Sequence, residues 1–388
     1  MKILFVVDEY FAKNNGLSIS AQRFSEELRG LGHEVRVLAS NVCGEPDYPL
    51  KEFKVPVFNK LIKRQGMTFA LCDEETIRRA VEWAEVVHLE DCFVLASHAA
   101  KTAFRLGRPC TGAFHIYPEN ITSSIHLAWC TPLNDAIFTG FRDYVFRWCS
   151  DIHCPAQGVA DRLRRHGYKA RLHVFSNGIT SEFTVERREK PPEYSGHFVV
   201  LMTGRYSVEK RQDVLINAVL RSKYRDRIQL VFAGQGPLEE HYRRLAKKLP
   251  IAPRFGFMQK NELMETMAFS DLYVHTAQAE IEGISCIEAM ASGLVPVIAD
   301  SPASSTPQFA LDERSLFPSG DSAALAERID YWLDHADERS AMGLKYHDHV
   351  EHYSIHDSAL LFENMLYTAY AAAYAEGSDG NLAAAQKP

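Results

Sequence analysis

The clearest signal of the fold is the segment Glu280-Ile-Glu-Gly-Ile-Ser-Cys-Ile-Glu288-Ala-Met-Ala-Ser-Gly-Leu-Val-Pro-Val297. An apolar strand is predicted just before it, at 272–276, and another at its end, at 295–299. Between them Gly283 precedes a predicted helix over 284–292. A strand, a glycine turn, a helix and a second strand make one βαβ unit of a parallel sheet. Free backbone N–H groups at such a helix start can hold a phosphate.

Short apolar runs and amphipathic helical stretches alternate along the rest of the chain. Further strands are predicted at 3–8, 34–39, 86–89, 110–116, 151–154, 172–175, 198–203 and 228–233. This alternation predicts the α/β class, with two doubly wound, Rossmann-like domains. Open sheets of this kind bind ligands at the carboxyl ends of their strands, so we expect both domains to face one interdomain cleft.

The domain boundaries follow from breaks in the alternation. We predict an N-terminal domain over 1–180 and a C-terminal domain over 198–350. The polar segment between them contains Pro191 and Pro192 and is expected to be a linker. A C-terminal helix over 351–376 has an apolar stripe that it must bury, and we expect it to cross back to the N-terminal domain.

The composition is that of an ordinary globular protein. The 388 residues are 46% hydrophobic and 24% charged, and their net charge of −7 weighs against a nucleic-acid partner. There is no run of about 20 apolar residues. The first apolar run meets Asp8 too early for a signal peptide, so we expect a cytoplasmic protein. The eight cysteines form no CxxC pair, and no metal site is predicted.

Three sequence blocks carry a resemblance to a known family. Glu280 and Glu288, followed by Ala-Met-Ala-Ser-Gly, resemble the EX7E signature of retaining glycosyltransferase family 4, which has the GT-B fold. Gly204-Arg-Tyr-Ser-Val-Glu-Lys210 is similar to the family's glycine-arginine block with a lysine five residues later. Val231-Phe-Ala-Gly-Gln-Gly-Pro-Leu238 resembles its GxGP turn. The resemblance covers essentially the whole chain.

The resemblance implies roles for residues of the C-terminal domain. Arg205 and Lys210 would bind the donor diphosphate and neutralise the leaving nucleotide, with no metal required. Glu280 would contact the transferred sugar, and Glu288 the nucleotide ribose. The backbone around three further residues would meet the sugar and the phosphate: Gly283, Ile284 and Ser285.

One position departs from the family pattern. Members commonly read Glu-x-Phe-Gly where this chain has Glu280-Ile281-Glu282-Gly283. The additional carboxylate leaves open whether Glu280 or Glu282 faces the sugar.

Two positions in the N-terminal domain are also candidates. Gly16, in the turn Asn14-Asn15-Gly16-Leu17, would let the backbone approach a phosphate, although an ordinary βα turn would look the same. The resemblance places a histidine near the reacting carbon of the sugar at the position of His115, which is otherwise a structural residue at a strand end. Glu119 and Asn120 are candidates for contacts to the acceptor or the sugar.

The implied reaction moves a hexose from a nucleotide diphosphate sugar, expected to be UDP-linked, to an acceptor hydroxyl with retention at the anomeric carbon. A front-face mechanism fits, because no side chain stands out as a covalent nucleophile. No cofactor is implied. The alternatives are a GT-B epimerase or phosphorylase and a catalytically inactive nucleotide-sugar-binding protein.

A membrane lipid or glycolipid, such as diacylglycerol, ceramide or a lipid-linked saccharide, is the acceptor that the resemblance favours. A soluble sugar or a polysaccharide is the alternative. Residues 1–175 carry 22 basic and 20 acidic side chains, whereas the remainder carries 21 and 30, so the N-terminal domain is the candidate for peripheral contact with an anionic membrane. Two segments mix basic and apolar side chains, 51–64 and 138–148, and a solvated helix face with buried aromatics is the competing interpretation of each.

Overall fold

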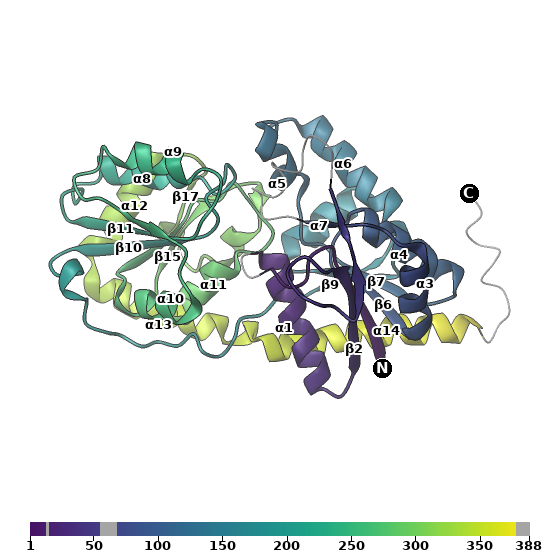
Figure 1. Ribbon diagram of the computed structural model, residues 1–388. Helices are drawn as coiled ribbons and strands as arrows, with labels where there is room; N and C mark the ends of the chain where they lie inside the picture. Colours follow the sequence, from purple (N-terminus) through teal and green to yellow (C-terminus); the bar gives the residue numbers. More distant parts are fainter. Residues whose placement is uncertain (13–14, 55–67, 378–388) are drawn as a thin grey trace. The chain divides into compact units, whose positions relative to one another are not determined.

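The computed structural model describes residues 1–12, 15–54 and 68–377. These residues divide into two units (Figure 1). The first unit comprises Met1–Ile116, Thr131–Gly178 and the chain from Ile355 onward, and the second comprises Tyr117–Cys130 and Ile179–Ser354. Each unit contains one large parallel sheet with helices around it, which confirms the predicted α/β class and the two Rossmann-like domains.

The sheet of the first unit has seven parallel strands in the order β3-β2-β1-β6-β7-β8-β9. The strands are β1 (Lys2–Val6), β2 (Glu34–Ser40), β3 (Tyr48–Leu50), β6 (Val86–Leu89), β7 (Cys110–Ala113), β8 (Asp151–Cys154) and β9 (Arg171–Val174). A separate antiparallel pair consists of β4 (Glu52–Phe53) and β5 (Phe69–Ala70). The strand order reverses between β1 and β6, and doubly wound sheets bind ligands at this switch point.

The main helices of the first unit are α1 (Gly16–Gly30), α3 (Glu74–Trp83), α4 (Val94–Arg105), α6 (Thr131–Tyr144), α7 (Gln157–Arg165) and α14 (Ile355–Gly377). The Asn15 side chain caps α1 by accepting a hydrogen bond from the Leu17 N–H. One face of the sheet is covered by α1 and α14, whose rings Phe24 and Phe362 pack edge to face with centroids 4.8 Å apart. Their contact closes the apolar core that includes Phe5 of β1.

The sheet of the second unit has six parallel strands in the order β12-β11-β10-β13-β15-β17. They are β10 (Phe198–Thr203), β11 (Ile228–Ala233), β12 (Arg254–Gly256), β13 (Leu272–His275), β15 (Pro296–Asp300) and β17 (Leu316–Pro318). A short parallel ladder beside this sheet pairs β14 (Ala279–Glu280) with β16 (Ala303–Ser304). The strand order again reverses at the first strand of the unit, between β10 and β13.

The helices of the second unit form two layers around this sheet (Figure 1). One layer holds α8 (Gln212–Arg221), α9 (Glu239–Ala246) and α12 (Ser322–Asp334), and the other holds α10 (Lys260–Phe269), α11 (Ile284–Ala291) and α13 (Ala336–Val350). Buried apolar residues from both layers and from all the central strands form one core. This arrangement explains why apolar strands alternate with amphipathic helices in the sequence.

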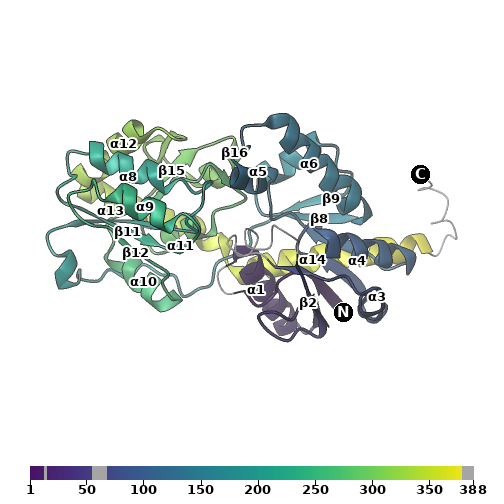
Figure 2. The ribbon, with the colours of Figure 1, turned by 45° about the horizontal axis from the view of Figure 1, so that its top comes forward.

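One predicted boundary is wrong, because Tyr117–Cys130 belongs to the second unit rather than to the N-terminal domain over 1–180. The segment contains the short helix α5 (Pro118–Thr122), which lies beside β16 in Figure 2. The Tyr117 hydroxyl lies 3.1 Å from the Ser305 hydroxyl, and the Asn120 amide donates to the Ala279 carbonyl at 3.4 Å. These contacts with the β14–β16 ladder hold the segment to the second unit.

The predicted linker over 181–197 is also wrong, because this segment packs onto the second unit. Phe183 and Tyr194 are each only 5% exposed and belong to its core. The Arg187 guanidinium donates to the backbone carbonyls of Ser270 and Gly293. The apolar residues are too widely spaced among charged ones to produce a periodic signal, which is why the segment resembles a linker in sequence.

The C-terminal helix starts at Ile355, later than the predicted 351, and belongs to the first unit. Residues 351–353 form a 3₁₀ turn of the second unit instead. The apolar stripe of the helix is buried through Phe362, Met365 and Leu366, each of which is 0% exposed. The chain therefore returns to its first unit at Ile355.

Candidate functional site

Lys210 and Glu280 form an ion pair in the second unit. Lys210 lies in the loop between β10 and α8, and Glu280 ends β14, so the pair joins two segments that follow neighbouring strands of the sheet. Each side chain is 18% exposed. Burial by itself raises the pKa of Glu280, but the charge of Lys210 and a hydrogen bond from His275 outweigh it and lower the pKa to about 2. Glu280 is therefore ionised at any working pH.

Backbone contacts fix the loop that carries Lys210. The Thr276 hydroxyl donates to the Lys210 carbonyl at 2.7 Å, and the Gln278 N–H donates to the Glu209 carbonyl at 2.7 Å. The loop also runs so close to Gly234 that a Cβ there would lie 2.0 Å from the Gly204 carbonyl oxygen. This close approach explains the first glycine of the predicted GxGP turn.

Arg205 lies in the same loop but pairs with a different carboxylate. Its guanidinium lies 2.9 Å from Glu209, which is 5% exposed and also accepts a hydrogen bond from the Ser207 hydroxyl at 2.6 Å. The Gln212 side chain donates to the Arg205 carbonyl. The two predicted diphosphate ligands thus share one loop and keep separate acidic partners.

The start of α11 requires a glycine. Gly283 is the N-cap and has φ +92°, and a Cβ at this position would lie 2.6 Å from the Thr306 hydroxyl. The first hydrogen bond of the helix runs from the Cys286 N–H to the Gly283 carbonyl. Ile284 and Ser285 are the first two helical residues, so their N–H groups precede this bond and belong to the exposed end of the helix dipole.

The structure distinguishes the glutamates of the signature. Glu280 pairs with Lys210, whereas Glu282 is 2% exposed and lies near Tyr353, whose pKa is raised by burial and by the Glu282 charge. The backbone carbonyl of Glu282 accepts a hydrogen bond from the Thr306 hydroxyl at 3.1 Å. Glu288 is 9% exposed and lies on α11, more than one turn beyond Gly283. Of the first two glutamates, Glu280 is the one grouped with the predicted phosphate ligand.

The sequence interpretation missed His275, which contacts Glu280, and Tyr273, which contacts His275. They are alternate residues of β13, so both side chains point to the same face of the strand. His275 Nε2 lies 3.5 Å from Glu280 Oε2, and burial lowers the pKa of His275, so the ring is neutral at pH 7. Two polar rings at i and i+2 in a strand that is otherwise apolar were the available signal.

In the first unit, His115 contacts a buried carboxylate. It follows β7, and its Nε2 lies 3.2 Å from Glu90, which follows β6 and is 1% exposed. His88 Nε2 lies 3.6 Å from the other oxygen of Glu90. His115 is therefore held at the carboxyl edge of the sheet, next to the switch point.

Two more carboxylates missed by the sequence interpretation lie at the same edge. The Asp8 N–H donates to Asp91 at 2.7 Å, and the Asp8 side chain accepts a hydrogen bond from the Ala70 N–H at 2.7 Å. Burial and the charge of Asp91 raise the pKa of Asp8, and burial raises that of Asp91 to about 6. In each case the signal was an acid two residues beyond the end of a buried strand.

Gly16 is the first residue of α1, directly after the N-cap Asn15. A Cβ at Gly16 would meet nothing within 4 Å, so packing within the fold does not require glycine there. Asn14 of the same turn lies outside the described residues.

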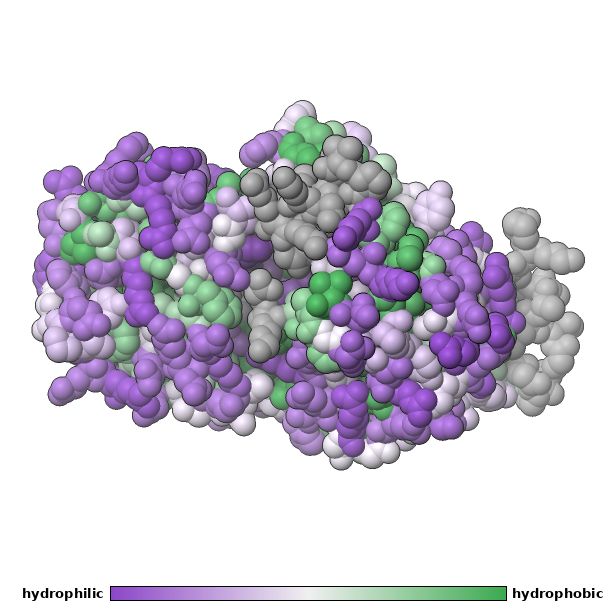
Figure 3. All heavy atoms as spheres, in the orientation of Figure 1, coloured by the Kyte–Doolittle hydropathy of each residue, from purple (hydrophilic) through white to green (hydrophobic). Residues whose placement is uncertain are grey.

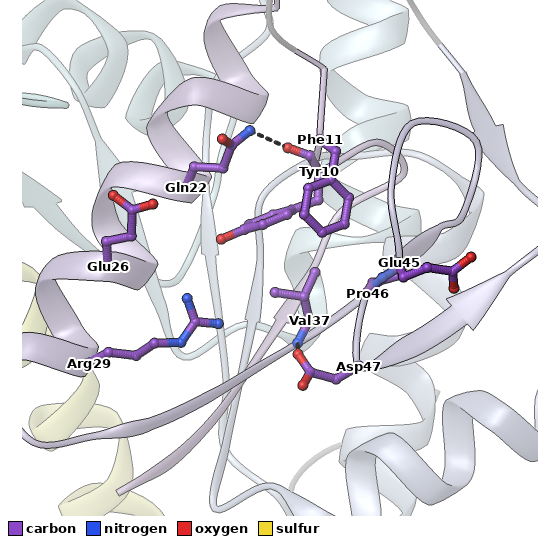
Figure 4. Close-up of a pocket in the computed structure, with 9 residues that line it drawn as sticks. All are labelled: Tyr10, Phe11, Gln22, Glu26, Arg29, Val37, Glu45, Pro46 and Asp47. Carbon is purple, nitrogen blue, oxygen red and sulfur yellow. Dashed lines mark hydrogen bonds between the residues drawn. The ribbon is translucent and has the colours of Figure 1, made fainter.

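A pocket of about 300 Å³ lies elsewhere in the first unit, between α1 and the segments around β2 (Figure 4). Its walls include the Tyr10 ring, Arg29 and Asp47. Arg29 is bound to the Val35 carbonyl, and Asp47 accepts a hydrogen bond from the Val37 N–H, so its polar groups serve the fold. No predicted site residue lines this pocket.

The structure describes the two segments that mix basic and apolar side chains, 51–64 and 138–148, to different extents. Most of 51–64, including Lys60, Lys63 and Arg64, lies outside the described residues. In 138–148 the rings of Phe138 and Phe146 are buried, and Arg142 pairs with Asp143. Because Tyr144 of the same segment is exposed, only part of it fits the interpretation as a solvated helix face with buried aromatics.

Trp129 is the most exposed large apolar side chain of the described residues, and Ile125 lies in the same α5–α6 connection. Figure 3 shows apolar surface over this connection at the top of the view. None of the helices that the structure describes is long and apolar enough to cross a membrane. Within 1–12, 15–54 and 68–377, no three His, Cys, Asp or Glu side chains are grouped as metal ligands.

Comparison with protein families gives two matches that together cover most of the chain. Residues 184–346 match the family "Glycosyl transferases group 1". Residues 14–183 match "Glycosyltransferase Family 4". The division between the matches lies near Ile179, where the long segment of the second unit begins.

Two curated relatives illustrate the range of activities among similar chains. The GDP-mannose-dependent alpha-mannosyltransferase of Corynebacterium glutamicum is 28% identical over 317 residues, which cover 77% of this chain and 72% of the relative. The alpha-monoglucosyldiacylglycerol synthase of Streptococcus pneumoniae is 24% identical over 326 residues, covering 77% and 71%. The first is named for GDP-mannose and the second for a glucosylated lipid.

Solved structures show the same fold. Anabaena HepE in complex with UDP-glucose superposes with a TM-score of 0.72 over 96% of this chain and 100% of that chain, at 16% identity. A partial match in sequence is the catalytic domain of cholesterol-alpha-glucosyltransferase from Helicobacter pylori, which is 48% identical, covers 40% of this chain and 99% of that chain, and has a TM-score of 0.40.

Proposed function

Because the chain belongs to the group 1 and family 4 glycosyltransferases, which have the GT-B fold, we propose that it transfers a hexose from a UDP-sugar to the hydroxyl of a membrane lipid or glycolipid, with retention. The observation that carries the proposal is the partly buried pair of Lys210 and Glu280, in which Glu280 lies three residues before the N-cap of α11. A cation and a helix N-terminus suit a diphosphate, and an ionised carboxylate suits sugar hydroxyls.

Charge stabilisation by side chains is the proposed source of catalysis. Lys210 and Arg205 would neutralise the negative charge that develops on the departing UDP, while Glu280 would accept hydrogen bonds from sugar hydroxyls. The departing phosphate oxygen would take the proton of the acceptor hydroxyl, and the new bond would form on the face that the phosphate leaves. Glu288 would bind the ribose, and His115 and Gly16 of the first unit would contact the sugar and the phosphate.

No metal ion is needed in this proposal, because two side chains carry the required positive charge. We expect turnover to be unchanged in EDTA. A loss of turnover in EDTA that Mg²⁺ restores would contradict this part of the proposal.

A donor screen by thermal shift tests the choice of nucleotide. We expect UDP-glucose, UDP-galactose or UDP-N-acetylglucosamine to raise the melting temperature of the wild type more than GDP-mannose does. The Lys210→Met variant should lose this stabilisation. Because one relative is named for GDP-mannose, that donor is the informative competitor. Selective stabilisation by GDP-mannose would overturn the UDP assignment and leave glycosyl transfer standing.

The acceptor needs a separate experiment. The proposal of a lipid rests on the family resemblance and on the relative named for diacylglycerol. The selected donor, radiolabelled in its sugar, should label vesicles that contain diacylglycerol, ceramide or a lipid-linked saccharide. In the cell, the proposed acceptor would lie at the inner face of a membrane. Full turnover on a soluble saccharide, with no association in a flotation assay using anionic vesicles, would contradict it. Donor binding without transfer to any acceptor would favour a nucleotide-sugar-binding protein.

A further inference from the structure

A line of polar side chains runs from Glu280 to the start of α11. His275 Nε2 lies 3.5 Å from Glu280, and His275 Nδ1 lies 3.5 Å from the Tyr273 hydroxyl. The Tyr273 hydroxyl lies 2.9 Å from the Ser285 hydroxyl. His275 is 1% exposed and Tyr273 is 0% exposed. The line therefore connects the proposed sugar ligand with the proposed phosphate-binding helix through the interior of one unit.

The chemistry of the groups gives the line a direction. Glu280 is ionised, so its oxygens only accept hydrogen bonds, and His275 must carry its proton on Nε2 to donate to it. The neutral ring then accepts at Nδ1, which requires the Tyr273 hydroxyl to donate. The Tyr273 oxygen in turn accepts from the Ser285 hydroxyl. Every buried polar atom along the line has a partner in this arrangement.

Thr306 supports the same tautomer. Its hydroxyl lies 3.5 Å from His275 Nε2 and donates to the Glu282 carbonyl at 3.1 Å. With its proton engaged there, the Thr306 oxygen can only accept from His275. The Nε2–H group of His275 therefore faces two acceptors, Glu280 and Thr306, which orient the ring toward Glu280.

Lys210 has two tasks that conflict. It pairs with Glu280 Oε2 in this structure, the same oxygen that His275 approaches. In the proposed function Lys210 also binds the donor diphosphate. A lysine is a single point charge on a flexible stem, so a bound diphosphate would draw it away from the carboxylate. His275 is then the remaining hydrogen-bond donor to Glu280 in this group of residues.

We propose that His275 is a positioning residue that holds Glu280 in the orientation that receives the sugar while Lys210 serves the diphosphate. The inference rests on the proposed function. It differs from a purely structural role for His275, because such a role would affect nucleotide and nucleotide-sugar equally. A positioning role would affect the binding of the nucleotide-sugar and leave the binding of the free nucleotide unchanged.

Two substitutions separate these roles. His275→Leu removes the donor, and His275→Gln places an amide N–H near the position of Nε2. Binding of UDP and of UDP-glucose is measured for each by calorimetry, together with kcat and KM. We expect His275→Leu to bind UDP within about twofold of the wild type but to lose about 10- to 100-fold in kcat and to bind UDP-glucose more weakly. His275→Gln should recover most of the loss.

A matched control is His347→Leu. His347 is a partly buried histidine of α13 in the same unit, and its Nδ1 lies 2.6 Å from the Ala291 carbonyl at the far end of α11. We expect it to leave the ratio of UDP-glucose to UDP affinity unchanged. If His275→Leu does not fold, Tyr273→Phe, which removes only the hydroxyl that donates to Nδ1, should still lower kcat without weakening UDP binding.

The outcomes separate the inference from the proposed function. Equal losses for UDP and UDP-glucose, or identical behaviour of the leucine and glutamine variants, would overturn the positioning role of His275. Wild-type kcat in both His275→Leu and Tyr273→Phe would do the same. A wild type that binds neither UDP nor UDP-glucose would overturn the proposed donor, and the inference with it.

Discussion

Lys210→Met should destabilise the second unit in a way that depends on pH. The substitution removes one charge and keeps most of the aliphatic stem. Glu280 then stays largely buried, with His275 Nε2 at 3.5 Å as the nearest donor on its interior side. A buried carboxylate that loses its cation is a recognised source of large destabilisation.

The magnitude follows from the pKa of Glu280. Its value of about 2 in the folded protein lies below the ordinary 4.5. A difference of about 2.5 pKa units corresponds to about 3 kcal/mol of stability at pH 7. We therefore expect Lys210→Met to lower the free energy of unfolding by about 2 to 3 kcal/mol at pH 7.

The sign of the pH dependence is set by the depressed pKa. Such a carboxylate contributes its full stabilisation above the unfolded pKa of 4.5 and loses it as the pH falls through about 2. At pH 3.5 about 2 kcal/mol of the contribution should remain. The difference between wild type and Lys210→Met should therefore shrink by roughly a third between pH 7 and pH 3.5.

Urea denaturation at the two pH values measures this difference, and the transition that UDP shifts to higher urea reports on the second unit. The double variant Lys210→Met/Glu280→Gln should be more stable than Lys210→Met alone. Arg243→Met, which breaks the exposed pair of Arg243 and Glu239, is the matched control, with an expected loss of less than about 1 kcal/mol. A loss that is equal at both pH values, or strictly additive losses in the double variant, would refute the reasoning.

Three further predictions concern other parts of the structure. Gly283→Ala should lower the free energy of unfolding by about 1 to 3 kcal/mol and weaken UDP binding. The reason is that alanine disfavours φ +92° and that its Cβ would meet the Thr306 hydroxyl. Urea titration with and without UDP measures both effects. Asp8→Asn should raise the melting temperature at pH 8 and have little effect at pH 4, since burial and the Asp91 charge raise the pKa of Asp8 and make its ionised form unfavourable; an equal effect at both pH values would contradict this explanation. Tyr117→Phe should lower the free energy of unfolding by about 1 kcal/mol in the transition that responds to UDP, because the Tyr117 hydroxyl contacts a serine of the second unit. An effect confined to the other transition would show that the segment is assigned to the wrong unit.

Sequence and structure agree where the signal is local. The alternation of apolar strands and amphipathic helices predicts both sheets, because a strand buried on both faces and a helix buried on one have different periods. The block from Gly204 to Lys210 and the two glutamates are recognisable for a similar reason, since each set lies within a short stretch that follows a strand.

The disagreements have a common cause, which is that tertiary contacts between distant residues leave no periodic trace. Tyr117–Cys130 lies among strands of the first unit in sequence but contacts the ladder around Ala279. Residues 181–197 are polar in composition and still bury Phe183 and Tyr194. A few anchors in an irregular segment are enough to dock it, and too few to reveal it in the sequence.

The class of fold, the family and the residue types available for a diphosphate and a sugar can be recognised in the sequence. That Glu280, and not Glu282, pairs with Lys210, and that His275 approaches the same carboxylate, is visible only in the folded chain. Two glutamates separated by one residue are equivalent in a sequence pattern. They differ in the folded chain because β14 ends at Glu280, and the turn into α11 directs the next acid toward Tyr353.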